Sequence, residues 1–168
     1  MHLKIFTDEN KLEEYLQILK YSLGRSGEIT ERLHREIQDG LIYTKNLPSD
    51  FQINGSSWIL YALYDKEEVV GTITLSEDRH VSDTAQVEYF ALKPEYRKKG
   101  WGMFMMDKMR KEIAAHSSFK TLILATGKGA GTMIYERYGM THVGMICFNG
   151  RERHFFIWPV VEHNNETT

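Results

Sequence analysis

The apolar residues in the first quarter of the chain recur every three or four positions, which is the period of an amphipathic helix. The first set follows a capping signal at Thr7-Asp8 and comprises Leu12, Leu16, Leu19 and Leu23. The second set begins near Glu28 and comprises Ile29, Leu33, Ile37 and Leu41. The sequence therefore predicts a short strand from Leu3 to Phe6 followed by two helices.

Beyond a polar loop from Leu47 to Ser57, short apolar runs replace the helical period and predict strands. These runs cover Trp58–Tyr64, Val69–Leu75, Thr84–Leu92, Thr121–Thr126, Met145–Phe148 and Arg153–Trp158. The last two flank Asn149-Gly150, a dipeptide that favours a type I′ hairpin turn. Helical patterns follow Gly102 and span Thr132–Tyr138. This order predicts an α/β fold with a mixed, mostly antiparallel sheet, helices on both faces, and one parallel step.

The stretch from Val87 to Met106 combines a strand, a break at Pro94, and the basic glycine-rich loop Arg97-Lys98-Lys99-Gly100-Trp101-Gly102. An apolar helical pattern follows at once. A helix N-terminus offers free N–H groups and the positive end of the helix dipole, and glycine lets an anion approach the backbone. The stretch therefore predicts a site for a phosphate-bearing molecule.

Composition narrows the classes of protein to consider. The chain has 168 residues, a net charge of -2 and one cysteine. We expect a single domain over residues 1–162, a polar disordered tail over 163–168, and neither a nucleic-acid nor a membrane partner. The histidines show no metal-ligand spacing, so no metal is expected. The N-terminus does not resemble a secretory signal, which predicts a cytoplasmic protein; a homodimer is left open.

Two motifs carry a resemblance to a known family. Arg97-x-x-Gly100-x-Gly102 after a strand, with Tyr135-Glu136-Arg137-Tyr138-Gly139-Met140 downstream, resembles the GNAT superfamily of acyl-CoA-dependent N-acetyltransferases. Met140 stands where the family usually has Phe. The predicted order of elements also matches, so the resemblance covers nearly the whole chain. It implies a GNAT-like fold and transfer of an acetyl or other short acyl group from acetyl-CoA to a primary amine of a small molecule or a protein.

The resemblance also implies a set of cofactor-binding residues. Backbone N–H groups from Lys98 to Met103 would hold the pyrophosphate of coenzyme A, and the preceding strand would pair with the pantetheine arm. The residues assigned in this way are Phe90, Ala91, Leu92, Arg97, Lys98, Lys99, Gly100, Trp101, Gly102 and Met103. One departure is Lys128, which lies near the position of an asparagine that often contacts pantetheine in the family.

Catalytic groups are less well specified. The resemblance implies that Tyr135 is the general acid, because a phenol can lend a proton to a leaving thiolate. Glu88 is a candidate base on the strand before the loop, on the same nominal face as Gln86 and Phe90. A structural glutamate in a salt bridge is an equal alternative. His80 and His142 are weaker candidates.

The cysteine, the methionines and one pair of phenylalanines are expected to pack in the core and to have no role in catalysis. A lone strand cysteine such as Cys147 is expected in the core, as are the methionines that follow Gly102 and the Phe155-Phe156 pair. A non-catalytic acyl-CoA-binding regulatory module of the same fold is the alternative function. A nucleotide-binding fold of another kind is set aside, because the chain lacks GxxxxGK[ST] and a correctly spaced GxGxxG.

Overall fold

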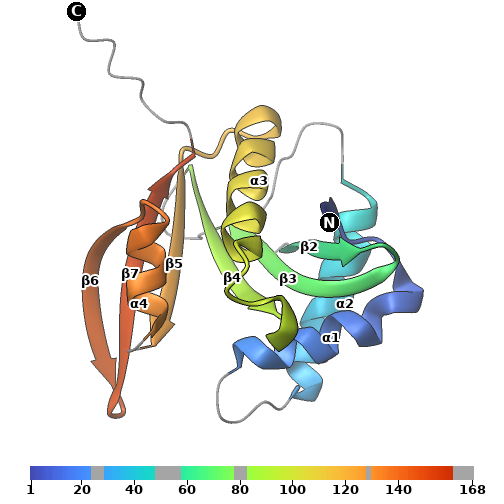
Figure 1. The fold of residues 1–168 in the computed structure, drawn as a ribbon, viewed down its shortest axis with the longest axis horizontal. Helices are drawn as coiled ribbons and strands as arrows, with labels where there is room; N and C mark the ends of the chain where they lie inside the picture. The colour runs from blue at the N-terminus through green and yellow to red at the C-terminus, as the bar shows by residue number, and fades with distance from the viewer. Residues whose placement is uncertain (24–28, 48–57, 78–82, 128–129, 161–168) are drawn as a thin grey trace, which may run out of the picture.

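The computed structural model describes residues 1–23, 29–47, 58–77, 83–127 and 130–160. It contains a seven-stranded sheet in the order β1-β2-β3-β4-β5-β7-β6 (Figure 1). The strands are β1 (His2–Ile5), β2 (Trp58–Asp65), β3 (Glu68–Glu77), β4 (Thr84–Leu92), β5 (Thr121–Gly127), β6 (Thr141–Phe148) and β7 (Arg151–Pro159). The helices are α1 (Leu12–Leu19), α2 (Glu31–Lys45), α3 (Trp101–His116) and α4 (Ala130–Arg137), with 3₁₀ turns η1 (Glu9–Lys11), η2 (Lys20–Ser22) and η3 (Pro94–Tyr96).

The sheet is antiparallel except at its centre, where β4 pairs with β5 in parallel. A parallel pair needs a crossover connection, and α3 provides it. The predicted fold class, with its single parallel step, is confirmed. The step matters for function because it separates an N-terminal group, β1 to β4, from a C-terminal group, β5 to β7.

Each face of the sheet carries its own core. On one face, α1 and α2 bury Tyr15, Ile18 and Ile37 against Leu60 and Ala62 of β2. The other face packs mainly against α3, where Met105, Met106, Met109 and Ile113 are fully buried with β-strand residues that include Ile73, Leu122 and Phe156. The expectation that the methionines of this helix pack in the core is confirmed. Burial on both faces fixes β2, β3 and β4 between two layers of helix.

Capping residues set where the first two helices begin. The side chain of Asp8 accepts a hydrogen bond from the Asn10 backbone N–H at the start of η1, as Thr7-Asp8 predicted. Thr30 caps α2 by accepting from the Leu33 N–H at 3.2 Å, so this helix begins at Glu31 rather than near Glu28. A threonine N-cap stabilises a helix by about 1 kcal/mol, which outweighs the apolar period that placed Ile29 inside it.

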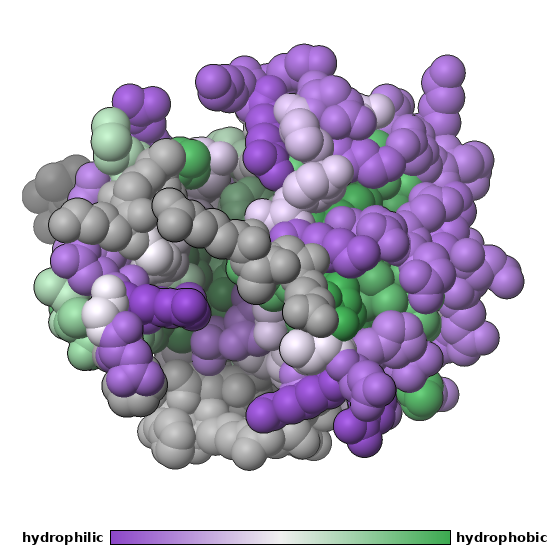
Figure 2. Space-filling model, turned by 90° about the horizontal axis from the view of Figure 1, so that it is seen from below, coloured by the Kyte–Doolittle hydropathy of each residue, from purple (hydrophilic) through white to green (hydrophobic). Residues whose placement is uncertain are grey.

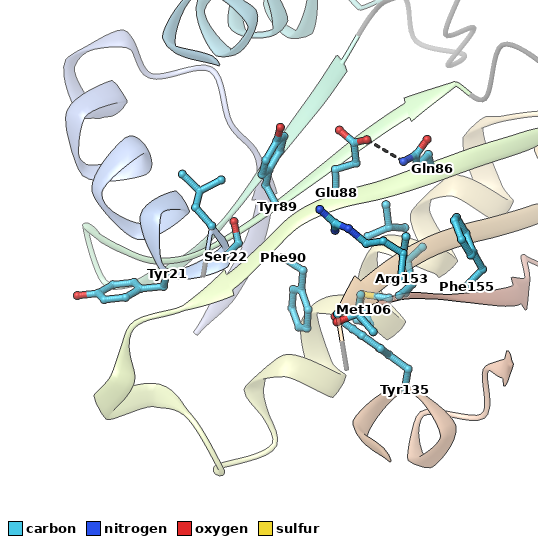
Figure 3. Close-up of a pocket in the computed structure, with 16 residues that line it drawn as sticks. Tyr21, Ser22, Gln86, Glu88, Tyr89, Phe90, Met106, Tyr135, Arg153 and Phe155 are labelled. Carbon is cyan, nitrogen blue, oxygen red and sulfur yellow. Dashed lines mark hydrogen bonds between the residues drawn. The ribbon is translucent and has the colours of Figure 1, made fainter. Parts of the chain in front are cut away.

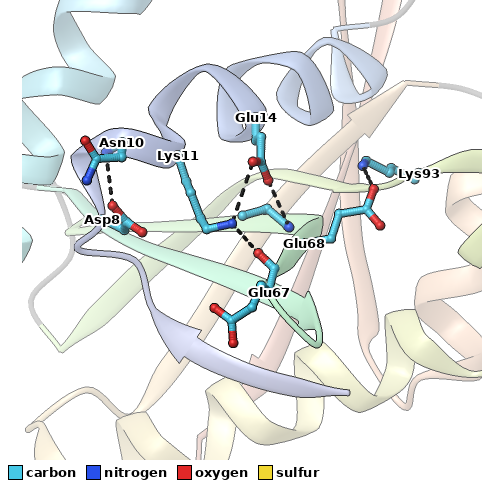
Figure 4. A network of polar contacts seen from close by, with 8 residues as sticks. Asp8, Asn10, Lys11, Glu14, Glu67, Glu68 and Lys93 are labelled. Atoms are coloured by element: carbon cyan, nitrogen blue, oxygen red, sulfur yellow. Dashed lines mark hydrogen bonds and ion pairs between the residues drawn. The ribbon is translucent and has the colours of Figure 1, made fainter.

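A network of polar contacts fastens the start of α1 to the β2–β3 turn (Figure 4). Lys11 contacts the carboxylate of Glu14 at 3.6 Å and the backbone carbonyl of Glu67. Glu14 in turn accepts a hydrogen bond from the Val69 N–H at 3.2 Å. These contacts hold α1 across the sheet and thereby direct its far end, the η2 turn, toward β4.

The C-terminal hairpin has the predicted turn. Asn149 and Gly150 have φ values of 51° and 70°, as a type I′ turn requires. The hairpin ends the sheet at β6, an edge strand that exposes Val143, Met145 and Ile146. Cys147 lies on this edge strand and is exposed, so the expectation of a core cysteine is wrong. The reason is topological, because an edge strand has a neighbouring strand on one side only.

Some predictions fall on parts of the chain outside the described residues. They concern Lys128, His80, the tail over 163–168 and most of the Leu47–Ser57 loop. Within the described part of the chain, no helix combines the length and the apolar character needed to cross a membrane.

Candidate active site

The central parallel pair of strands is joined over only part of its length. Thr84 to Val87 of β4 pair with Thr121 to Leu124 of β5, and pairing stops there although both strands continue. The two ribbons diverge visibly toward the end where η2 lies (Figure 1). Backbone N–H and C=O groups along the two diverging edges are therefore available to a ligand rather than to each other.

A β-bulge in β4 lies beside this opening. Thr74 of β3 faces Glu88 and Thr72 faces Ala91, so Tyr89 and Phe90 together face a single residue, Ile73. Tyr89 has a φ of 47°, and its carbonyl accepts a hydrogen bond from the Thr72 hydroxyl at 3.1 Å. A bulge re-aims side chains and leaves a residue unpaired.

The bulge changes which face Phe90 occupies. Phe90 packs against the core beneath α3, whereas Tyr89 packs against the core beneath α1 and α2. In Figure 3, Phe90 points away from the side that Glu88 and Tyr89 occupy. The prediction that Glu88 and Phe90 share a face is wrong, because simple alternation does not hold across a bulge.

The gap between the unpaired ends of β4 and β5 leads into a cavity of about 710 Å³. Its lining comes from η2, β4, α3, β5, α4 and β7, and comprises Tyr21, Ser22, Leu23, Gln86, Val87, Glu88, Tyr89, Phe90, Met106, Leu124, Ala125, Thr126, Gly127, Tyr135, Arg153 and Phe155 (Figure 3). Seen from below, the molecule is hollowed, and both apolar and hydrophilic residues are visible in the hollow (Figure 2). A cavity of this size can hold a small molecule or the reactive end of a larger one.

The glycine-rich loop lies where β4 ends and α3 begins. The backbone turns through η3, Lys98 has a φ of 58° and Gly100 has a φ of 83°. Gly100 is the N-cap of α3, and glycine has no side chain to cap the free N–H groups of Trp101, Gly102 and Met103. The side chains of Arg97, Lys98 and Lys99 are exposed beside them. This arrangement suits an anion such as a pyrophosphate.

Gly102 is required by packing rather than by backbone conformation. A Cβ at this position would lie 2.7 Å from the Tyr138 hydroxyl oxygen and 3.2 Å from Cζ of Phe90. The N-terminus of α3 therefore packs closely against the end of α4 and against β4. Gly100, by contrast, has open space around it and needs glycine for its left-handed conformation.

Arg97 differs from the two lysines that follow it. Its Nε donates to the Leu92 carbonyl at 3.0 Å, and its guanidinium lies over the Tyr21 ring at 5.3 Å. The side chain thus ties the loop to the end of β4 and to η2. Of the three β4 residues assigned to the pantetheine arm, Phe90 lines the cavity, while Ala91 is buried opposite Thr72 and Leu92 lies opposite Gly71.

Tyr135 projects from α4 into the cavity. Its ring packs against Phe156 with 5.6 Å between centroids and against Tyr138 with 6.3 Å. Burial raises the pKa of Tyr135 to about 12, so the phenol is neutral at physiological pH. A neutral phenol can donate a hydrogen bond to a nearby anion.

Glu88 enters the cavity from β4, on the side facing α2. Gln86 Nε2 donates to one carboxylate oxygen of Glu88 at 2.8 Å, and no salt bridge to Glu88 is found among the described residues. Burial, followed by the carboxylate of Glu36, raises the pKa of Glu88 above its usual 4.5. A carboxylate with a raised pKa is a stronger base than an exposed one.

Sequence reasoning missed several residues that line the cavity. They are Tyr21, Ser22, Gln86, Arg153 and Phe155, which come from three elements far apart along the chain. Arg153 and Phe155 alternate along β7, but that pattern predicts only a strand with two faces. His142, a weaker candidate base, does not line the cavity; its Nε2 lies 3.2 Å from His154 Nδ1 and its ring packs on Phe156.

The structure has a parallel strand pair that opens into a cavity, a helix N-terminus beside it that suits a phosphate, and a phenol on the next helix. These are the features that the resemblance to acyl-CoA-dependent transferases implies. The sequence profile of the acetyltransferase (GNAT) family matches residues 28–140. The chain belongs to the GNAT acetyltransferase family, and acetyl-CoA is its co-substrate.

Solved structures show the same fold at low sequence identity. An aminoglycoside 6'-N-acetyltransferase complexed with coenzyme A is 15% identical, with a TM-score of 0.73 over 96% of this chain and 98% of that one. The ribosomal-protein-S18-alanine N-acetyltransferase from Escherichia coli is 12% identical, with a TM-score of 0.68 over 99% and 98%. A Bacillus subtilis acetyltransferase in complex with CoA is 14% identical, with a TM-score of 0.66 over 95% and 99%. No curated protein sequence matches the chain.

Proposed function

We propose that the protein is a cytoplasmic N-acetyltransferase that moves an acetyl or other short acyl group from acyl-CoA to a primary amine by direct attack. The acceptor is a small molecule or a protein amine, the two kinds named for the structural neighbours. The observation that carries the proposal is a single cavity at the open end of the β4–β5 pair. It brings Glu88, Tyr135 and the diverging strand edges together beside the loop at the start of α3.

The loop and the strand edge would anchor the donor. Backbone N–H groups from Lys98 to Met103 suit the pyrophosphate, with Lys98 and Lys99 adding positive charge. The amides of the pantetheine arm would pair with β4 where β5 has diverged, as an added strand pairs with a sheet edge. A backbone N–H of the bulge at Tyr89 and Phe90 would donate to the thioester oxygen as negative charge develops on it.

The chemical step forms a C–N bond and breaks the C–S bond of the thioester. An amine must lose a proton to attack, and Glu88 would accept that proton directly or through a water molecule. Gln86 holds one of its oxygens, and the raised pKa makes the carboxylate a better acceptor. The products are an amide and the thiol of coenzyme A.

Tyr135 would stabilise the departing sulfur. A thiol has a pKa of about 8.5, so full proton transfer from a phenol with a pKa of about 12 is unfavourable by roughly 5 kcal/mol. The difference favours a short hydrogen bond from the phenol to the developing thiolate, while the proton that completes the thiol comes from solvent, to which Glu88 returns the proton taken from the amine. Tyr135 is therefore proposed as the general acid acting chiefly through this hydrogen bond.

The test is to mix the protein with acetyl-CoA and a panel of amines and to follow the release of free thiol. Acetylated amine should appear in equal amount, as detected by mass spectrometry. Firm binding of acetyl-CoA with no thiol release from any amine would overturn the proposal and favour a non-catalytic acyl-CoA-binding module.

A further inference from the structure

Two charged side chains of opposite sign are found among the cavity-lining residues, Glu88 on β4 and Arg153 on β7. Glu88 has a role in the proposed chemistry, whereas Arg153 has none. In Figure 3, the guanidinium of Arg153 reaches back across the cavity toward the β4 residues Glu88 and Tyr89. The positive charge of Arg153 would interact with any ligand that binds in the cavity beside Glu88.

Arg153 lies opposite Gly127 of β5 and Ile146 of β6 in the sheet. Its charge is felt on β4: burial raises the pKa of Tyr89 to about 12, Glu88 and Glu36 add to this, and Arg32 and Arg153 oppose it. No hydrogen bond or ion pair of the Arg153 guanidinium is found within the described part of the chain. Its fork of N–H donors therefore lines the cavity without an acceptor among the described residues.

Neighbouring arginines are engaged differently. Arg32 pairs with Glu36 at 2.8 Å on the surface of α2, and Arg97 donates to the Leu92 carbonyl. Neither lines the cavity. Arg153 is thus the cationic group among the described residues that an acceptor in this cavity would meet.

We propose that Arg153 binds a carboxylate of the acceptor, so that the substrate class is an amine that carries a carboxylate, of the amino-acid type. This inference rests on the proposed N-acetyltransferase function and names its acceptor. The amine lies at Glu88 and the carboxylate at Arg153, which makes the cavity complementary to a dipolar molecule at both ends.

The chemistry favours a carboxylate over other partners of a guanidinium in this cavity. Arginine presents parallel N–H donors that match the two oxygens of a carboxylate, and charge-assisted pairs of this kind are roughly twice as strong as neutral hydrogen bonds. A dication such as a diamine would place its second charge near Arg153 and be repelled. Apolar lining from Phe90, Met106 and Phe155 leaves room for a hydrocarbon side chain.

The experiment compares matched acceptors that differ only in the acidic group. For each of three carbon skeletons, those of glycine, leucine and phenylalanine, kcat/KM is measured for the amino acid, its amide and the corresponding decarboxylated amine. At least one amino acid should exceed its amide and its amine by about 10- to 100-fold, the loss expected when a charged hydrogen-bond partner is removed. Equal or higher kcat/KM for the amides or amines of all three skeletons would overturn the inference and leave the acetyltransferase intact.

Two variants locate the effect. Arg153→Gln should erase the preference for the acid, chiefly by raising KM for the amino acid, while the KM for acetyl-CoA stays unchanged. Arg151→Gln removes the same charge from the same strand at an exposed position that does not line the cavity, and it should keep the preference. A preference that survives in Arg153→Gln would overturn the assignment of Arg153.

A binding measurement separates failure of the inference from failure of the proposed function. Calorimetric titration of glycine, leucine and phenylalanine into the protein saturated with coenzyme A should show affinity that Arg153→Gln weakens about tenfold or more. Thiol release with amides and amines but not with amino acids would overturn the inference about the acceptor and leave the proposed acetyltransferase function in place. Arg153-dependent amino-acid binding without any thiol release sinks the proposed chemistry alone.

Discussion

The two sides of the β4–β5 opening differ in the groups that form them, which are mainly backbone groups on one side and side chains on the other. The proposed cofactor side, comprising the Arg97–Met103 loop and the contact between Gly102 and Tyr138, consists of backbone N–H groups, a left-handed glycine and close helix packing. The proposed acceptor side, comprising Glu88, Arg153, Phe155 and the η2 residues Tyr21 and Ser22, consists of side chains from separate elements. A backbone site can tolerate many sequences, whereas the side chains of the proposed acceptor side would determine which acceptor is used.

Tyr135 is the proposed general acid between the two sides, and the loss of its hydroxyl should have the largest effect. Tyr135→Phe keeps the ring that packs on Phe156 and removes the hydroxyl, so kcat should fall about 100-fold or more. Acetyl-CoA affinity, measured by calorimetry, should change little. Tyr138→Phe, at the residue directly after the end of α4, is the matched control; an equal fall in kcat there, or no fall with Tyr135→Phe, would contradict the role.

The pH dependence of kcat/KM and the Glu88→Gln variant test the proposed acceptor side. Because the candidate base must be deprotonated, kcat/KM should rise with pH through its pKa, which lies above 4.5. Glu88→Gln should lower kcat/KM about 10- to 100-fold and remove that ionisation from the pH profile. A profile that keeps the same acidic limb in Glu88→Gln would assign the limb to another group.

The same carboxylate should cost stability. The folded protein binds the Glu88 proton more tightly than the unfolded chain, because burial raises its pKa. Stability from this group is therefore present below the unfolded pKa and lost as pH rises through the folded value. Since glutamine cannot ionise, Glu88→Gln should raise the melting temperature at pH 7 relative to wild type and converge with it near pH 4.

Gly102 tests the cofactor side. Gly102→Ala places a Cβ 2.7 Å from the Tyr138 hydroxyl, so either the start of α3 or the Tyr138 side chain must shift. We expect a loss of about 1–3 kcal/mol in the free energy of unfolding and about tenfold weaker acetyl-CoA binding, with acceptor preference unchanged. Removing the hydroxyl in Gly102→Ala/Tyr138→Phe should recover part of both; an additive further loss would refute this contact as the cause.

The loop lysines should give the smallest change. Lys98→Gln and Lys99→Gln each remove an exposed charge, so acetyl-CoA affinity should fall only about two- to fivefold, and less at high salt. Lys108→Gln, an exposed residue further along α3, is the control. A loss above about 50-fold would mean that a lysine side chain, rather than the backbone, dominates phosphate binding.

This division explains what the sequence could predict. The loop, its strand and its helix are contiguous, so a local motif sufficed to predict that Gly100 and Gly102 belong to the cofactor site. The order of elements and the parallel step likewise followed from periodicity. The contact between Gly102 and Tyr138 could not be predicted from periodicity, because these two residues come together only in the folded protein.

The acceptor side could not be predicted in the same way. Arg153 reaches the cavity because β7 lies beside β5, and pairing across 26 residues of sequence leaves no local signal. The bulge at Tyr89 reversed the expected face of Phe90, since a single extra residue shifts the alternation of everything after it. The helix start at Glu31 moved for a similarly local reason, the cap at Thr30.

The exposed position of Cys147 has a practical consequence for every experiment that counts released thiol. As the single cysteine of the chain, it contributes one accessible sulfhydryl per molecule before any turnover occurs. Reagents that detect coenzyme A by disulfide exchange would therefore register the protein itself in a stoichiometric burst. Cys147→Ser provides a silent background, and the native cysteine offers a single attachment point for a fluorophore on the outer strand.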